Sequence, residues 1–107
     1  MTDFMHVVTT TDTREHASKI GRYLLDCRLG GCVQVSGPIT SSYWWKGKIE
    51  ESEEWHCVIK TATEKYEEVE RAIRLIHTYE EPEIIAIPVL FGSESYLAWL
   101  RASLTWT

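Results

Sequence analysis

Residues 32–61, CVQVSGPITSSYWWKGKIEESEEWHCVIKT, decide the fold of this chain, because two extended runs flank a single short reversal. Residues 32–45 are β-branched, aromatic and hydroxylic, Lys46-Gly47-Lys48 supplies a tight turn, and residues 49–61 form the returning arm. At about 3.3 Å per residue the first arm would extend about 45 Å, whereas a domain of this length has a radius of gyration of about 13 Å. The tip, with Tyr43, Trp44 and Trp45, must overhang the domain and requires a partner surface.

The two arms of the hairpin differ in pattern. Gly37-Pro38 predicts a bend or bulge in the first arm, because proline cannot donate to a strand ladder. In the returning arm Trp55, Cys57 and Ile59 alternate with Glu54, His56, Val58 and Lys60, which predicts one apolar and one mixed face.

The residues before the hairpin predict a strand and a helix. Residues 5–10 alternate and are rich in Val and Thr, as in a strand. Asp12-Thr13-Arg14-Glu15 predicts a capping box with Asp12 as the cap, and Gly30-Gly31 predicts the left-handed end of the helix. The apolar residues between them follow helical spacing and include Ala17, Ile20 and Leu24.

The residues after the hairpin predict a helix, a strand and a final helix. Thr63 is the expected cap of the first of these helices, which ends near residues 77–78. Its apolar positions, three or four residues apart, are Tyr66, Val69, Ile73 and Ile76. Residues 83–91 predict a buried strand that Pro88 converts in part to an edge or bulge, and Gly92-Ser93 begins a short terminal helix.

This order of elements predicts one α+β domain over residues 1–107, with the ferredoxin-like βαββαβ arrangement and a short C-terminal helix. Two helices would cover one face of an antiparallel sheet. The other face has only the terminal helix, so Trp55 and Ile59, or their alternating neighbours, are expected to be buried against other subunits.

Composition excludes several classes of protein. The 107 residues contain 11 Lys and Arg against 16 Asp and Glu, a formal charge of -5, which disfavours nucleic acid as a partner. The same order of elements builds RNA-recognition modules, but the strand reads Glu53-Glu54-Trp55-His56-Cys57 where such a module needs basic and aromatic residues. No apolar run is long enough for a membrane span, and three unpaired cysteines fit a reducing cytoplasm.

The densest polar group lies between the second helix and the following strand. Residues 77–83, HTYEEPE, combine an imidazole, a phenol and carboxylates, a mixture that suits copper(II) or another divalent metal. The alternative is a solvated acidic turn with His77 near the end of a helix dipole. Lys60 could bind an anion or pair with Glu83, or reach solvent along its stem. Because adjacent strand residues face opposite ways, only one of Trp44 and Trp45 would line a given pocket.

Several blocks of this sequence resemble the signature blocks of the CutA divalent-cation-tolerance family. They run in order through nearly the whole chain and comprise residues 32–35, 37–41, 43–50, 59–61, 77–88 and 96–100. The resemblance implies a ferredoxin-like homotrimer in the cytoplasm, similar in architecture to PII signalling proteins, whose long hairpins exchange edge contacts.

The resemblance also implies site residues. The family's polar set at the cleft between subunits corresponds here to Trp45, Lys60, Tyr79 and Glu83, with metal ligation at His77. The hairpin contact that holds the trimer together corresponds to Tyr43 and Trp44, and Trp55 is predicted to join this interface.

Four hypotheses follow from the sequence. The leading one is a trimeric protein without catalytic activity that responds to divalent metal ions or binds a small ligand. The others are a structural scaffold, an RNA-binding module, and an enzyme using Lys60, His77 or Glu83 as an acid or base.

Overall fold

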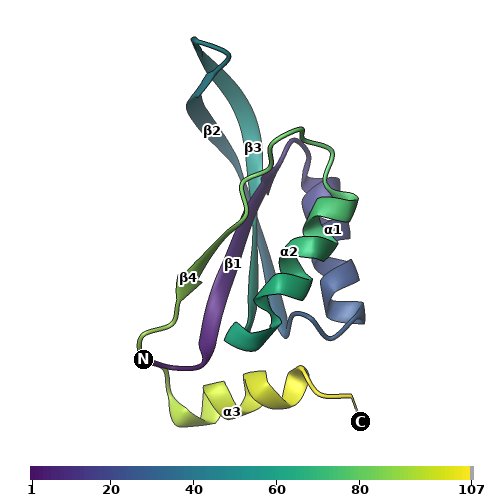
Figure 1. The fold of residues 1–107 in the computed structure, drawn as a ribbon, viewed down its shortest axis with the longest axis vertical. Helices are drawn as coiled ribbons and strands as arrows, with labels where there is room; N and C mark the ends of the chain where they lie inside the picture. The colour runs from purple at the N-terminus through teal and green to yellow at the C-terminus, as the bar shows by residue number, and fades with distance from the viewer. Residues whose placement is uncertain (107) are drawn as a thin grey trace.

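The computed structural model describes residues 1–106 as a four-stranded antiparallel sheet with helices on both faces (Figure 1). The elements in chain order are β1 Phe4–Thr11, α1 Arg14–Asp26, β2 Cys32–Trp45, β3 Lys48–Ala62, a 3-10 turn Thr63–Lys65, α2 Tyr66–Ile76, β4 Ile85–Pro88 and α3 Glu94–Ser103. The strand order β2-β3-β1-β4 is that of a ferredoxin-like fold, which confirms the predicted architecture.

The helices cover one face of the sheet and leave the other face largely open. Helices α1 and α2 pack on one side, where Val7, Ile20, Ile59 and Ile73 are fully buried in the main core. Helix α3 crosses one end of the other side, where Leu100 packs against Phe4 and Ala62 (Figure 1). No helix of residues 1–106 covers the rest of that second face.

The β2-β3 hairpin has the predicted turn and bulge. Trp45 pairs with Lys48, so a two-residue loop of Lys46 and Gly47, both at positive φ, reverses the chain. The register shifts between Ser36 and Ile39, at the predicted Gly37-Pro38 bulge.

The hairpin extends well beyond the body of the sheet (Figure 1). Strand β1 pairs with β3 only as far as Trp55, and no other strand of the described part of the chain lies beside the remainder of the hairpin. The chain measures 45 × 26 × 23 Å, and the indole of Trp44 in the projecting part is 72% exposed. The predicted overhang is confirmed.

Alternation along β3 decides which residues face the open side. Trp55, Cys57 and Ile59 point toward α1 and α2, with Trp55 half-buried at the edge of the core. Their neighbours His56, Val58 and Lys60 therefore point toward the open face. Of the two alternatives drawn from the sequence, the neighbours are the ones that face the open side.

Both predicted ends of helix α1 are wrong in detail. Its cap is Thr13, whose hydroxyl accepts from the His16 amide at 3.1 Å, because the helix starts one residue later than a cap at Asp12 requires. The left-handed residue after the helix is Arg28, with φ 58°, rather than Gly30 or Gly31. Amide donation from Leu29 to the Leu24 carbonyl closes the helix around Arg28.

Two later predictions are also corrected. Thr63 does not cap α2, since a 3-10 turn occupies residues 63–65 and the helix begins at Tyr66. The buried strand predicted over residues 83–91 is only the four-residue edge strand β4, and Ile85 and Ile87 are exposed. Strand β4 lies at the edge of the sheet with β1 on one side only, which leaves its apolar side chains exposed in one chain, and the Val89 amide beyond Pro88 still donates to the Phe4 carbonyl at 3.0 Å.

We predict that Gly37→Ala destabilises the protein by about 1–3 kcal/mol, because a Cβ atom at residue 37 would lie 2.6 Å from Cδ1 of Trp55. Urea unfolding at one fixed protein concentration measures the change. Gly47→Asn is the matched control, because Gly47 has open space around it and asparagine tolerates positive φ. Equal stability of Gly37→Ala and the wild type would contradict the predicted packing of Trp55 on the bulge.

Candidate functional site

The candidate site is a cavity of about 670 Å³ beneath the projecting half of the hairpin. We call it the hairpin cavity. Strand β2, one residue each of β1 and β3, and the loop between α2 and β4 line it. The lining residues are Thr10, Ser41, Ser42, Tyr43, Trp44, Trp45, Glu54, Tyr79, Glu80, Glu81 and Glu83. Its volume is in the range of small-molecule sites in proteins.

His77 anchors the loop that closes one side of this cavity. As the first residue after α2, it places its Nε2 atom 2.7 Å from the Thr10 carbonyl oxygen, to which it donates. Its Nδ1 atom accepts from the Tyr79 amide at 3.1 Å. These two bonds require a neutral imidazole protonated at Nε2 and leave neither ring nitrogen with a free lone pair.

Tyr79 joins the same loop to the hairpin. Its hydroxyl donates to Oε2 of Glu54 at 2.7 Å, and the Glu54 residue is only 7% exposed. Burial raises the pKa of the Tyr79 hydroxyl, and the hydrogen bond and charge of Glu54 raise it further, so the phenol keeps its proton. The neutral Tyr79 hydroxyl is thereby held as a hydrogen-bond donor to the buried carboxylate of Glu54.

His16 of α1 lies beside His77, with the two ring centroids 5.6 Å apart and the rings edge to face. Its Nε2 atom is buried and has no hydrogen-bond partner among residues 1–106. Burial lowers the pKa of His16, and the proximity of His77 lowers it as well. His16 therefore favours its neutral form at the base of the loop.

Lys60 lies at the other end of the sheet. Its Nζ atom is 5.6 Å from the centroid of the Tyr96 ring in α3. In the pairing of β3 with β1, Lys60 lies opposite His6. Lys60 follows Glu54 by six positions along β3, which corresponds to about 20 Å of extended chain. Within one chain, therefore, Lys60 is remote from the hairpin cavity.

The structure thus brings together three of the residues predicted for the cleft and separates one. Trp45, Tyr79 and Glu83 line the hairpin cavity, His77 supports it, and Lys60 does not reach it. The location of this set between subunits stays a prediction, as does the role of Tyr43, Trp44 and Trp55 in a trimer interface. Tyr43 and Trp44 line the cavity as well, so the prediction that only one of the two adjacent tryptophans would line a given pocket is wrong.

Sequence reasoning missed Glu54 and the hydroxyls of Thr10, Ser41 and Ser42 as cavity residues. The alternation of β3 did place Glu54 on the mixed face, but its burial depends on Tyr79, twenty-five residues further along the chain. A single carboxylate in a run of four acidic residues within 50–54 carries no local signal of burial.

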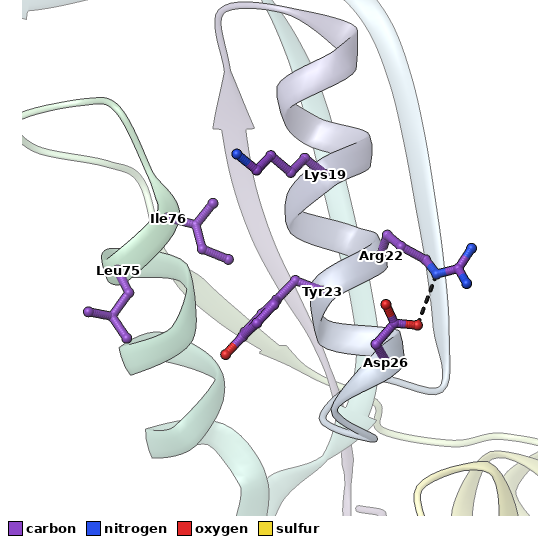
Figure 2. A pocket seen from close by; sticks show the side chains of 6 residues that line it. All are labelled: Lys19, Arg22, Tyr23, Asp26, Leu75 and Ile76. Carbon is purple, nitrogen blue, oxygen red and sulfur yellow. Dashed lines mark hydrogen bonds and ion pairs between the residues drawn. The ribbon is translucent and has the colours of Figure 1, made fainter.

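A second cavity, of about 530 Å³, lies on the outer surface between α1 and α2 (Figure 2). Tyr23 points from α1 toward Leu75 and Ile76 of α2, while Arg22 and Asp26 form an ion pair with each other at 2.9 Å (Figure 2). The charges of Arg22 and Asp26 neutralise each other. Lys19 is the one charged lining residue outside this ion pair. This shallow site offers little specific chemistry.

The fit of a metal ion can be tested against the donors present. Within the described part of the chain, no group of three His, Cys, Asp or Glu side chains is arranged to hold a metal ion. His77 could ligate a metal through Nδ1 only after releasing the Tyr79 amide. One chain in this conformation therefore does not provide a ready metal site.

Fold and site together define a class: a small ferredoxin-like domain with a projecting hairpin and a polar, aromatic cavity beneath the projecting half of that hairpin. The family model for the CutA1 divalent ion tolerance protein matches residues 5–103. The chain belongs to this CutA1 family, and the resemblance seen in the sequence is confirmed. None of the described helices is long and apolar enough to cross a membrane.

Individual relatives agree with this result. The divalent-cation tolerance protein CutA of Archaeoglobus fulgidus is 37% identical over 100 residues, covering 94% of this chain and 95% of the relative. The divalent-cation tolerance protein CutA of Thermotoga maritima is 40% identical over 97 residues, covering 91% of this chain and 95% of the relative. The solved structure of the Archaeoglobus fulgidus protein, described as periplasmic, covers 95% of this chain and 99% of its own, with a TM-score of 0.92 and 34% identity.

We predict that the imidazole of His6 titrates below the ordinary pKa of 6.5 and that Lys60→Met raises its pKa toward that value. Burial lowers the pKa of His6, and the nearby Lys60 ammonium lowers it further. The unfolded chain consequently binds more protons near pH 6, so His6 makes the protein less stable as the pH falls from about 7 to 5.

Histidine NMR titrations of the wild type and Lys60→Met measure this shift, and urea unfolding at pH 7 and pH 5 measures the accompanying stability. Lys65→Met, which removes a cation from the 3-10 turn, is the control and should leave His6 unchanged. A His6 pKa that does not move in Lys60→Met would rule out the proposed proximity of the two groups.

Proposed function

We propose that the chain serves divalent-cation tolerance in the cytoplasm as a homotrimer without catalytic turnover, and that the hairpin cavity is its ligand-binding region. The observation that carries this proposal is a hairpin whose aromatic half projects from the domain and roofs a cavity of small-molecule size. Membership in the CutA1 family supplies the link to divalent cations.

The distribution of exposed apolar side chains supports assembly. Trp44 and Ile49 are exposed on the hairpin, Ile85 and Ile87 on the edge strand β4, and Phe91 is 82% exposed just beyond it. A monomer would leave all of these groups, and the outer backbone edges of β2 and β4, in water. Self-association would bury them, and it would also help a chain of this size to remain stable without disulfides.

A divalent metal ion is the ligand that the family description favours, and we propose copper(II) or another divalent metal with His77 as the nitrogen donor. Imidazole nitrogen suits copper(II) and zinc, and the glutamates of the neighbouring loop are oxygen donors. Because Nδ1 of His77 accepts from the Tyr79 amide, metal binding there must release that amide and loosen the loop.

A second candidate is a trimeric small-ligand-binding signalling or scaffold protein resembling PII proteins. The specific observation in its favour is the cavity volume of about 670 Å³ combined with carboxylates that do not converge on one point within residues 1–106. Such a cavity is better matched to a molecule than to a bare ion.

Light scattering tests the assembly. We expect the mass of the wild type to be three times the subunit mass of 12.4 kDa. Trp44→Glu should reduce this mass, because it places a charge in the proposed hairpin contact. Leu75→Glu should not, since Leu75 is at least as exposed but lies on α2. A monomeric wild type at micromolar concentration would overturn the trimer.

Titration with copper(II) tests the metal site. We expect the wild type to bind copper(II) above a nonspecific baseline, and His77→Ala to lose most of this binding. His56→Ala is the matched control, because His56 is a half-buried histidine of β3 that does not line the hairpin cavity. If the wild type and His77→Ala bind alike, or neither binds, the proposed metal site is wrong.

A further inference from the structure

We infer that the hydrogen bond between Tyr79 and Glu54 is a latch that keeps the Nδ1 atom of His77 covered by a backbone amide. This inference rests on the proposed role of His77 as a metal ligand and specifies how that ligand is controlled. The three residues of the latch bond to one another within one chain. The latch therefore does not depend on what covers the hairpin cavity in an assembly.

Both ring nitrogens of His77 are occupied. Nε2 donates to the Thr10 carbonyl oxygen at 2.7 Å, and Nδ1 accepts from the Tyr79 amide at 3.1 Å. A neutral imidazole with its proton on Nε2 carries its lone pair on Nδ1, and a metal ion binds through that lone pair. A metal ion and the Tyr79 amide therefore compete for the same atom.

Tyr79 is held at both of its ends. Its backbone amide binds His77, and its hydroxyl donates to Oε2 of Glu54 at 2.7 Å. Between these two ends, the phenol ring lies against the imidazole of His77 with the ring centroids 4.7 Å apart. The amide can leave Nδ1 only if Tyr79 shifts, and the bond of its hydroxyl to Glu54 resists that shift.

Glu54 is a firm attachment point for the latch. The residue is only 7% exposed, and its backbone is held in β3 by pairing with Ile39 of β2. A hydrogen bond to a carboxylate is stronger than one between neutral groups, and its loss leaves a buried acceptor without its Tyr79 donor. Glu54 is thus a positioning residue, which acts on His77 through Tyr79.

The latch lowers the affinity of His77 for a metal ion. Nδ1 is available only in the fraction of molecules in which the Tyr79 amide has left it, and the apparent affinity falls in proportion to that fraction. Removal of the Tyr79 hydroxyl enlarges this fraction, because one of the two bonds that hold the residue is gone. A variant without the hydroxyl should therefore bind metal more tightly than the wild type, whereas ordinary damage to a binding site weakens binding.

Hydrogen exchange of the backbone amide of residue 79, followed by NMR on the assembled protein, tests the latch without any metal. We expect this amide to exchange at least about tenfold faster in Tyr79→Phe than in the wild type. The His77 amide, which donates to the Ile73 carbonyl oxygen at 2.8 Å, is the internal control and should keep its protection. Unchanged exchange at residue 79, or equal acceleration of both amides, would overturn the latch.

Tyr43→Phe is the matched control variant. Tyr43 also lines the hairpin cavity, but its hydroxyl bonds with Oγ of Ser52 at 3.2 Å instead of with Glu54. It should leave the exchange rate of the residue 79 amide within twofold of the wild type. Glu54→Gln keeps an oxygen for the Tyr79 hydroxyl but removes the charge, so its rate should lie between those of the wild type and Tyr79→Phe. Equal effects of Tyr43→Phe and Tyr79→Phe would contradict the inference.

Copper(II) titration of the same proteins separates the latch from the proposed function. We expect Tyr79→Phe to bind copper(II) about fivefold more tightly than the wild type, and Tyr79→Phe/His77→Ala to lose this binding. If the wild type binds copper(II) and Tyr79→Phe binds it no more tightly, the latch does not control the metal ligand. If neither binds copper(II) but the residue 79 amide exchanges faster in Tyr79→Phe, the latch is supported and the proposed metal site is wrong.

Discussion

The backbone pairing of β2 with β3 is the interaction on which the rest of this structure depends. It runs from the pair Cys32 and Lys60 to the pair Trp45 and Lys48, while β1 accompanies β3 only as far as Trp55. The hairpin is thus part of a four-stranded sheet at its base and a two-stranded ribbon at its tip. An isolated ribbon is at best marginally stable in water, so the proposed assembly would stabilise the projecting half of the hairpin.

The loop after α2 is attached at the point where the sheet becomes a ribbon. His77 binds the backbone of β1 and orients Tyr79, and Tyr79 binds Glu54 of β3. Three elements that are distant in sequence are thereby connected through neutral donors and one buried carboxylate. This connection explains why a cavity persists beneath the hairpin instead of the loop simply remaining in solvent, and it gives His77 a structural role in addition to any role in metal binding.

Membership in the CutA1 family and the chemistry of the cavity address different levels of function. The family relates the chain to divalent-cation tolerance. The cavity has carboxylates and aromatic rings around a volume of about 670 Å³, which is a property of a molecular binding site. A metal ion requires donors that converge on one point, and no three acidic, histidine or cysteine side chains of the described residues converge in this way within one chain.

The sequence by itself determined the features that depend on neighbours in the chain. The turn at Lys46 and Gly47, the bulge at Gly37-Pro38, the apolar faces of α1 and α2 and the cap at Ser93 all follow from local backbone and side-chain preferences. The order of these elements was sufficient for the fold class. The blocks of family resemblance were sufficient for the candidate residues Trp45, Tyr79 and Glu83, which the cavity brings together.

Only the tertiary structure decided the remaining features, because each depends on a contact between distant residues. Arg28 adopts the left-handed conformation that a glycine was expected to take, and its guanidinium binds the Ser103 carbonyl of the last turn of α3. The same guanidinium lies over the ring of Trp106, whose place the sequence did not reveal. Lys60 lies far from the cavity because strand length separates it, and Glu54 is buried because Tyr79 reaches it across twenty-five residues. Local preference acts over a few residues, whereas burial and charge pairing are set by whatever the fold brings into contact.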